Sequence, residues 1–474
     1  MKILFTHTYF LTFDKKQLEL GKPYPPLATI LAASYMRENG FDVSFFDTNY
    51  ILSPDEIEPV IENYLPEVLV IYDDGFNYLT KMCLTNMREA AFEMIQIAKA
   101  KNIPVIVSSS DSTDHYKTYL EKGADVVILG EAEETLLELV TQLKEKEDIF
   151  ETEGIVFRNP ENLSQVIKTP SRKIRVELDK LPLPAWDLIE IGTYKKVWEK
   201  QGYFSINVAT TRGCPYKCNW CAKPIYGNRY NSRSPQHVVN ELKLIKSLFD
   251  FDHIWFCDDI FGLKPNWIVE FNTELKKENI KLRYKIQSRA DLLLKDETIK
   301  NLAESGCEEV WIGAESGSQK ILDAMDKNTT VEQIIESTQL MKKHGIKPCY
   351  FLQFGYLGET WEDIKLTNKL LFSNMPFDIG VSVSYPLPGT KFYDKVAYQL
   401  DKKANWVDSD ELLLMFENTY KPIFYKKLHT FIHKRFRQKQ IENDFSVVKL
   451  PKWGYFKLTS NLLYLNLLII KTKT

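Results

Sequence analysis

Three closely spaced cysteines are the residues of this chain best suited to bind a metal. Cys214, Cys218 and Cys221 follow the pattern C-x3-C-x2-C within ATTRGCPYKCNWCAKPIYGNRY, and no fourth cysteine lies nearby. Disulfides need pairs, whereas the chain has seven cysteines. Structural zinc usually takes four ligands, and the next histidine, His237, falls at the start of an expected helix. An iron–sulfur cluster held by three thiolates, with one iron left open, is the remaining interpretation.

The other cysteines and the loop residues point the same way. Cys257, Cys307 and Cys349 stand alone on or beside apolar segments, where a small buried residue is expected. By contrast, Arg212 and Gly213 just before the first cysteine of the motif belong to a loop rather than a core.

Further polar residues and glycines follow apolar segments at points where strands should end. They are Asp258 and Asp259 in WFCDDIFG, Arg289 in KIQSRADLL, Glu315 and Ser316 in VWIGAESGSQKIL, and Gly355, Gly358 and Gly389 in two later motifs. Each aspartate could instead be a helix N-cap or turn carboxylate, and Arg289 could be a solvated surface residue. The glycines would allow close backbone approach to a ligand, although ordinary turns need glycine too.

The segment that carries these motifs alternates apolar runs with helical periodicity. Its expected strands are Ser205–Thr210, His253–Cys257, Arg283–Gln287, Glu309–Gly313, Lys347–Phe354 and Ile379–Tyr385. Six strand–helix units predict an incomplete (β/α)6 barrel over residues 197–395, with its chemistry on the loops at the carboxyl ends of the strands. The three cysteines follow the first of these strands directly.

Residues 1–150 show a second, separate alternation of strands and helices. The expected strands are Lys2–Thr6, Val43–Phe46, Val68–Tyr72, Val105–Ser108 and Asp125–Leu129. The pattern predicts a doubly wound parallel sheet of the Rossmann-like type. Pro182 and Pro184 mark residues 151–196 as a linker, and residues 396–474 form a helical extension, so the fold class is α/β.

The bulk composition favours a soluble intracellular protein and gives no reason to expect a nucleic-acid-binding one. A hydrophobic fraction of 44% in 474 residues allows a large core, and the net charge of -3 gives no reason to expect nucleic acid. No apolar stretch is long enough to span a membrane, and an odd number of cysteines favours reduced thiols in the cytoplasm.

The cysteine loop after the first barrel strand, with Trp220 before the third cysteine, resembles the signature of the radical S-adenosylmethionine (SAM) superfamily. The resemblance implies a [4Fe–4S] cluster on Cys214, Cys218 and Cys221 whose open iron binds SAM. One electron then cleaves the sulfonium to methionine and a 5′-deoxyadenosyl radical. It also implies cofactor-binding roles for the residues at the later strand ends. These are Asp258 and Asp259 at the amino group, Arg289 at the carboxylate, Glu315 and Ser316 at the ribose, and Gly355 near the adenine or substrate.

The first domain resembles the cobalamin-binding domain of the anaerobic cyclase and hopanoid-methylase group. GKPYPPLATILAASYMRENGFDVSFFDTN and GADVVILGEAEETLLEL carry this resemblance, which implies that Ser108, Ser109 and Gly130 contact the nucleotide tail of a corrinoid. The tRNA methylthiotransferases also place a doubly wound domain first, but theirs holds three cysteines and this one holds only Cys83. The histidine motif D-x-H-x-x-G is absent, and His7 is expected in a capping or surface role. The resemblance therefore implies a corrinoid bound without that histidine, or a domain that binds none.

These resemblances imply methyl transfer from SAM through cobalamin to a carbon of a small-molecule or lipid substrate, with a flavodoxin or ferredoxin as electron donor. Cyclisation, oxidation and a corrinoid-free radical reaction are the enzymatic alternatives, and a zinc- or RNA-binding module is the non-enzymatic one. The tail joins the basic segment YKKLHTFIHKRFRQKQ to the apolar LLYLNLLII. It predicts either a helix packed on the barrel or peripheral contact with an anionic membrane.

Overall fold

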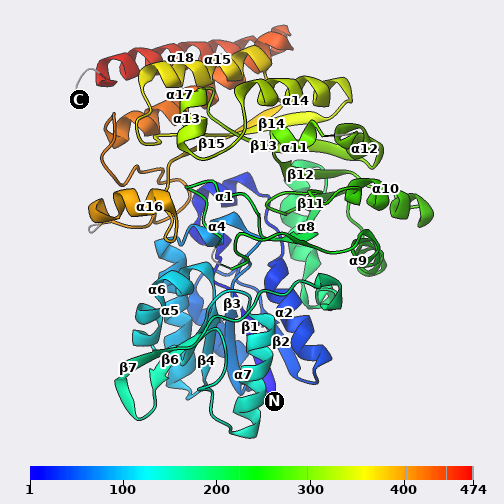
Figure 1. The fold of residues 1–474 in the computed structure, drawn as a ribbon, viewed down its shortest axis with the longest axis vertical. Coiled ribbons are helices and arrows are strands. Elements are labelled where there is room, and N and C mark those ends of the chain that lie inside the picture. Colours follow the sequence, from blue (N-terminus) through cyan, green and yellow to red (C-terminus); the bar gives the residue numbers. More distant parts are fainter. Residues whose placement is uncertain (224, 296, 401–402, 445, 472–474) are drawn as a thin grey trace.

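The computed structural model describes residues 1–223, 225–295, 297–400, 403–444 and 446–471. Two large sheets and a helical tail make up most of the molecule, with the first sheet at one end, the second above it and the tail outermost (Figure 1). Buried apolar side chains from both sheets join in one continuous core.

Sheet A forms the amino-terminal part, in the order β2-β1-β3-β4-β5-β6-β7. Its strands are β1 (Lys2–Thr6), β2 (Asp42–Phe46), β3 (Val68–Tyr72), β4 (Val105–Ser108), β5 (Val126–Ile128), β6 (Ile155–Asn159) and β7 (Asn162–Lys168). The first five are parallel, as predicted, while β6 and β7 add to the sheet in antiparallel fashion. The segment expected as a linker therefore begins with two strands of this sheet.

Helices cover both faces of sheet A, which confirms the doubly wound arrangement (Figure 1). They are α1 (Lys15–Leu20), α2 (Leu27–Glu38), α3 (Ile57–Tyr64), α4 (Tyr78–Lys81), α5 (Thr85–Ala100), α6 (Ser110–Glu121) and α7 (Glu133–Glu145), with short 3-10 turns at Leu11–Phe13 and Pro54–Glu56. α2 packs with α7 on one face, and α3 packs with α5 on the other. The central strands β1, β3, β4 and β5 are buried from both sides, as their apolar sequences require, whereas β7 is largely exposed.

The connection to the second sheet runs through 3-10 turns at Leu178–Lys180, Trp186–Leu188 and Glu199–Gln201 and through α8 (Ile191–Trp198). Sheet B then has six parallel strands in the order β15-β14-β13-β12-β11-β8. They are β8 (Ser205–Val208), β11 (His253–Phe256), β12 (Tyr284–Ser288), β13 (Cys307–Glu315), β14 (Lys347–Phe354) and β15 (Asp378–Val383). This is the predicted incomplete barrel.

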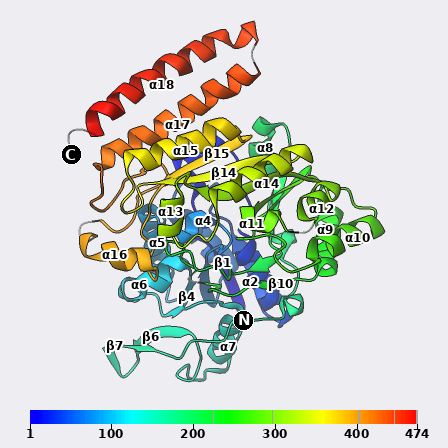
Figure 2. The ribbon, with the colours of Figure 1, turned by 45° about the horizontal axis from the view of Figure 1, so that its top comes forward.

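The helices of the barrel and the tail complete the chain. They are α9 (Pro235–Leu248), α10 (Trp267–Lys277), α11 (Ala290–Leu293), α12 (Thr298–Glu304), α13 (Gln319–Ala324), α14 (Val331–Lys343), α15 (Trp361–Asn374), α16 (Lys391–Val396), α17 (Pro422–Asn443) and α18 (Leu450–Lys471), with 3-10 turns at Ala397–Gln399 and Val447–Lys449. α17 packs against β15 and α15, which confirms the prediction of a tail helix on the barrel, and α18 lies outside α17 (Figure 2). Among the residues that the structure describes, no helix is long and apolar enough to cross a membrane.

The chain returns to sheet A between the barrel and the tail. We call residues 405–409 the strap, because they hydrogen-bond back to the amino-terminal part. The Thr85 N–H donates to the Trp406 carbonyl (2.9 Å), and the Ser409 hydroxyl donates to Asp14 (2.9 Å). Arg88 donates to the side chain of Asn405 (2.8 Å).

Candidate metal centre and cofactor site

The loop that carries the cysteine motif, residues 213–230, is closed at its base by two short antiparallel strands. β9 (Thr211–Arg212) pairs with β10 (Asn231–Ser232). Gly213 opens the loop with a φ of 77°, and a Cβ at this position would overlap the carbonyl oxygen of Arg229. The sequence needs glycine here both for the left-handed backbone and for the close approach of the two ends of the loop.

Asn219, between the second and third cysteines of the motif, fixes the loop to the barrel. Its backbone N–H donates to Met325 (3.0 Å) and its side-chain amide donates to Ala324 (2.7 Å). Its side-chain oxygen accepts from the Tyr356 hydroxyl (2.7 Å) at the end of β14. The loop is therefore held to two strand–helix connections, although Asn219 carries no motif that singles it out in the sequence.

The three thiols lie close enough to influence one another electrostatically, and the structure contains no disulfide among its described cysteines. Burial raises the pKa of the Cys221 thiol to about 11 and also raises that of Cys214, while Lys223 opposes both shifts. Cations that bind here must displace these thiol protons. In the described part of the chain, no group of three or more His, Cys, Asp or Glu side chains is arranged to hold a single metal ion. A four-iron cluster instead spreads its thiolates over different irons.

Asp258 and Asp259 differ in their surroundings. Asp258 is buried and accepts hydrogen bonds from the Thr210 N–H, the Thr211 N–H and the Thr210 hydroxyl at 2.6–2.7 Å. Burial raises the pKa of Asp258 to about 6. Asp259 forms an ion pair with Lys81 of α4 (3.0 Å) and influences the thiols of Cys214 and Cys221. Asp258 thus fastens the end of β8, and Asp259 is the aspartate nearer to the thiols.

Arg289 is buried, so the surface alternative for this residue is wrong. It forms an ion pair with Asp291 (2.9 Å) and donates to the carbonyls of Lys327 (2.9 Å) and Asn328 (3.1 Å). Its guanidinium lies 3.8 Å from the centre of the Tyr216 ring in the cysteine loop. Arg289 therefore holds the segment after α13 against the loop.

Lys327, which the sequence patterns did not single out, lies beside the predicted ribose-binding residue Glu315. Its Nζ is 2.8 Å from Glu315 Oε1, and it lies 6.0 Å from the centre of the Trp220 ring. Burial alone would lower the pKa of Lys327, but Glu315 and nearby Cys218 outweigh burial and raise it. A Cβ at Gly313 of β13 would overlap this ion pair. The pair therefore occupies space that glycine leaves open on the strand.

Ser316 and Gly355 are engaged in packing at the strand ends. The Ser316 hydroxyl is buried 3.0 Å from that of Thr367 in α15. Gly355 has a φ of 80°, and its N–H donates to Glu359 (2.7 Å). A Cβ on Gly355 would press on Tyr425 of α17 at 3.2 Å. Burial also raises the pKa of Glu359 to about 8.

The candidate corrinoid contacts lie at the carboxyl edge of sheet A. Ser108 is buried, and its carbonyl accepts from the Asp73 N–H (2.9 Å). Ser109 caps α6 through the Ser112 N–H (2.8 Å), and next to it the buried Ser110 hydroxyl has no partner among the described residues. Gly130, with a φ of 79°, faces the carbonyl of Ile225 in the cysteine loop. This edge of sheet A therefore adjoins the metal-binding loop.

His7, at the end of β1, is buried rather than at the surface. Its Nε2 lies 2.9 Å from Asp47, and its Nδ1 lies 3.2 Å from the Thr48 hydroxyl. Of the expected capping or surface role, the surface alternative is therefore wrong, and both ring nitrogens already have partners. This arrangement agrees with the absence of the D-x-H-x-x-G motif.

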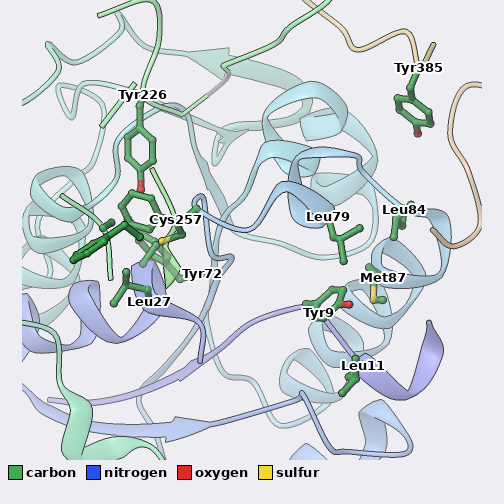
Figure 3. Packing of buried hydrophobic residues seen from close by; sticks show 14 of the residues in the cluster. Tyr9, Leu11, Leu27, Tyr72, Leu79, Leu84, Met87, Tyr226, Cys257 and Tyr385 are labelled. Atoms are coloured by element: carbon green, nitrogen blue, oxygen red, sulfur yellow. The ribbon is translucent and has the colours of Figure 1, made fainter. Parts of the chain in front are cut away.

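A buried ion-pair network joins the two sheet edges. Arg212 of β9 donates to Glu131 (3.0 Å) and Glu133 (2.5 Å), which follow β5. The Arg212 guanidinium also stacks on Tyr226 of the cysteine loop, 5.0 Å from the ring centre. Figure 3 shows Tyr226 gathered with Tyr72 of sheet A and Cys257 of sheet B, which confirms the buried prediction for Cys257. The network predicts that the cysteine loop and sheet A move as one unit.

Residues 208–371 match the model of the radical SAM superfamily. The chain therefore contains a radical SAM domain, which implies a [4Fe–4S] cluster and SAM as cofactors, and the cysteine loop lies within the matched segment. The chain is 26% identical over 395 residues to the uncharacterized methyltransferase PH0819 of Pyrococcus horikoshii, covering 82% of each protein. It is also 26% identical over 456 residues to the anaerobic magnesium-protoporphyrin IX monomethyl ester cyclase of Rubrivivax gelatinosus, covering 90% of this chain and 78% of the cyclase.

Among solved structures, the cobalamin-dependent SAM radical enzyme OxsB with aqua-cobalamin bound superimposes with a TM-score of 0.76 at 18% identity. The superposition covers 98% of this chain and 72% of OxsB. The predicted order of a doubly wound domain, an incomplete barrel and a helical extension is thereby confirmed as a known fold.

Proposed function

We propose that Cys214, Cys218 and Cys221 bind a [4Fe–4S] cluster and that the chain uses it to cleave SAM reductively. The observation that carries this proposal is the placement of three free thiols on a single loop, closed by β9 and β10, at the carboxyl end of the first barrel strand. Three thiolates, with no fourth cysteine on the same loop, suit a cluster that keeps one iron open. When bound, the cluster supplies one electron to the sulfonium of SAM.

Lys327 and Glu315 are our candidates for the polar contacts of SAM. The two side chains form a buried ion pair at the carboxyl end of β13, with Lys327 beside the Trp220 ring. They fill space that a side chain at Gly313 would otherwise take. Lys327 can donate to the carboxylate of SAM, and Glu315 can accept from the ribose hydroxyls. Arg289 positions Lys327 by donating to its carbonyl, and Asp259, whose charge acts on the Cys214 thiol, is our candidate for the amino group of SAM.

The carboxyl edge of sheet A is the candidate corrinoid site. The buried Ser110 hydroxyl, which has no partner among the described residues, fits a hydrogen bond to a nucleotide tail, and Gly130 borders the same edge. His7 is already held by Asp47 and Thr48, so the corrinoid would bind without a histidine from this position. The Ser108 carbonyl accepts a hydrogen bond from the N–H of Asp73, which follows the neighbouring strand β3.

Methyl transfer to an unactivated carbon of a small-molecule or lipid substrate is the reaction we propose. The similarity to PH0819, named a methyltransferase, favours it. The similarity to the Rubrivivax cyclase supports ring formation or oxidation as a second candidate, and the engaged His7 supports a corrinoid-free reaction as a third. A flavodoxin or ferredoxin is the proposed electron donor. We further propose that the protein works in the reducing cytoplasm, where free thiols persist.

Anaerobic reconstitution tests the cluster. We expect about four irons and four sulfides per chain, and loss of both in Cys218→Ala. Cys349→Ala is the matched control, because Cys349 is buried in β14 away from the loop and should leave the iron content unchanged. Zinc without sulfide in the wild type would overturn the proposal and favour a zinc-binding module.

Corrinoid content is measured separately on the protein purified from cells supplied with cobalamin. We expect about one corrinoid per chain, with binding weakened by Ser110→Val, because an apolar side chain of similar shape removes the buried hydroxyl. A protein that binds the cluster but no corrinoid would support the corrinoid-free reaction.

A further inference from the structure

The outermost helix, α18, has two apolar faces, and the molecule uses only one of them. Ser460 and Leu467 are completely buried against α17. On the opposite side, Tyr455, Leu458, Leu462 and Leu465 are between 52% and 63% exposed. We call these four residues the apolar stripe. Figure 2 shows α18 as the most peripheral element, with α17 between it and the barrel.

The spacing of the apolar stripe is that of a helix-pairing seam. Its residues succeed one another at intervals of three, four and three, which is the a/d pattern of a heptad repeat. A narrow seam of this kind fits a second helix, whereas a helix that lies on a membrane presents a wider apolar face.

The residues that flank the stripe favour a second helix over a membrane as its binding partner. Thr459 and Asn466 flank one side, and Asn461 flanks the other, so no charge borders the seam along its central turns. A helix that binds an anionic membrane needs lysine or arginine beside its apolar face. Lys457 is turned toward the ring of Trp453, 4.4 Å from its centre, away from the stripe. Uncharged flanks allow two identical helices to approach without repulsion.

We propose that the apolar stripe of α18 is a contact between two copies of this chain, with the two helices antiparallel. A twofold axis near Leu462 would place Leu458 of one copy against Leu465 of the other. Lys452, at the start of α18, would then lie about 30 Å from its counterpart across the axis. Lys434 of α17, which lies on Tyr455, would be about 20 Å from its own counterpart, and both distances exceed the screening length of about 8 Å. A parallel pair would bring these like charges together.

The area of the stripe sets the strength of this contact. Four half-exposed side chains amount to roughly 400 Å² of apolar surface per copy, which is a sizeable patch for a monomer. Two copies would bury at most roughly 800 Å² of it, which is below the roughly 1,200 Å² of standard specific interfaces, so we expect a weak and transient dimer. This contact does not depend on the proposed cofactors.

Sedimentation of the full chain over a range of concentrations tests the proposal. We expect the mass to rise from 55.3 kDa toward twice that value, and to stay at 55.3 kDa in the double variant Leu458→Glu/Leu465→Glu. Because both side chains are already exposed, the variant should fold, which its circular dichroism would verify. Leu163→Glu is the matched control, a 65% exposed leucine on β7 of sheet A that should leave the dimer intact.

Mixing two single variants tests the antiparallel arrangement. Leu458→Glu and Leu465→Lys should each dimerise poorly alone but pair when mixed, because the new charges face each other only in the antiparallel dimer. A wild-type chain that stays monomeric at about 100 µM would overturn the proposal. So would flotation of the wild type, but not the double variant, with phosphatidylglycerol vesicles, which would assign the stripe to a membrane.

Discussion

The carboxyl edges of the two sheets share one device, a threonine–aspartate clasp between neighbouring strand ends. In sheet A, Asp73 after β3 accepts from the N–H (2.7 Å) and the hydroxyl (2.8 Å) of Thr8 after β1. In sheet B, Asp258 after β11 accepts from the N–H (2.7 Å) and the hydroxyl (2.6 Å) of Thr210 after β8. Burial raises the pKa of each of these aspartates to about 6.

The two edges differ in the segments attached to the clasp. In sheet B the chain continues into β9 and the cysteine loop, and the second aspartate, Asp259, pairs with Lys81 across the interface. In sheet A the second aspartate, Asp74, stays within the amino-terminal part. It accepts hydrogen bonds from the Ala28 N–H (3.2 Å) and the Phe76 N–H (3.1 Å). Equivalent strand ends therefore do not imply equivalent chemistry, which depends on the loop that each strand end carries.

Cutting the connection between the two edges should have the largest effect. Arg212→Met leaves Glu131 and Glu133 buried without their cation, so we expect the free energy of unfolding to fall by about 3–5 kcal/mol in a urea titration. Arg37→Met is the control, because the pair of Arg37 with Asp187 is half-exposed and should contribute at most about 1 kcal/mol. Equal losses in the two variants would show that the buried network does not hold the edges together.

A change at the start of the cysteine loop should impair iron binding, which only the edge of sheet B supports. Gly213→Ala forces a side chain into the Arg229 carbonyl at a positive φ, which we expect to cost about 3 kcal/mol and to remove most of the iron after reconstitution. Gly389→Ala has a similar φ of 74° but nothing within 4 Å of the new Cβ, so it should keep its iron. Full iron content in Gly213→Ala would contradict the proposed geometry of the loop.

The two clasps should titrate alike. Asp73 and Asp258 have folded pKa values near 6, above the unfolded value, so the folded state keeps protons that the unfolded state releases. The free energy of unfolding should therefore fall as the pH rises from about 4 to about 6, by up to about 2–3 kcal/mol for each carboxyl.

Asp73→Asn and Asp258→Asn should each remove part of this slope. Asp187→Asn should leave it intact, since a hydrogen bond from Arg37 lowers the pKa of Asp187. Chemical denaturation at a series of pH values measures the slope. A change in slope for only one of the two clasp variants would show that the clasps are not equivalent.

The smallest expected effect is on the affinity of the reconstituted protein for SAM. Lys327→Met should weaken SAM binding to the reconstituted protein by roughly tenfold or more, because a charged hydrogen bond is lost, while the iron content is kept. Lys320→Met is the control, because Lys320 pairs with Asp363 at the surface of the barrel. Equilibrium dialysis gives the affinity, and an unchanged affinity in Lys327→Met would remove this residue from the proposed site.

The fold and the cysteine loop were largely predictable from the sequence, because they rest on local patterns. Strand and helix periodicity predicted both sheets, and the spacing of Cys214, Cys218 and Cys221 together with the preceding strand predicted the loop. The pairing of β6 with β5 was not predictable, since strand pairing between separated segments leaves no local pattern.

The partners of the charged residues at the site were the least predictable part. Lys327 lies in an ordinary helix-end segment, and its partner Glu315 follows an irregularity in the pairing of β13 with β14. A surface position was one of the alternatives for both Arg289 and His7, whereas both are buried. Long-range packing determines such burial, and a single sequence carries little information about it.

The strap has a consequence for the order in which the protein matures on the ribosome. Sheet A is complete once Lys168 has emerged, but Asn405 and Trp406, which bond to its edge, are synthesised roughly 240 residues later. At about 5–20 residues per second, sheet A stays without the strap for roughly 10–50 seconds of translation. A bulky ligand of that edge thus has an interval for loading during synthesis before the hydrogen bonds of the strap can form.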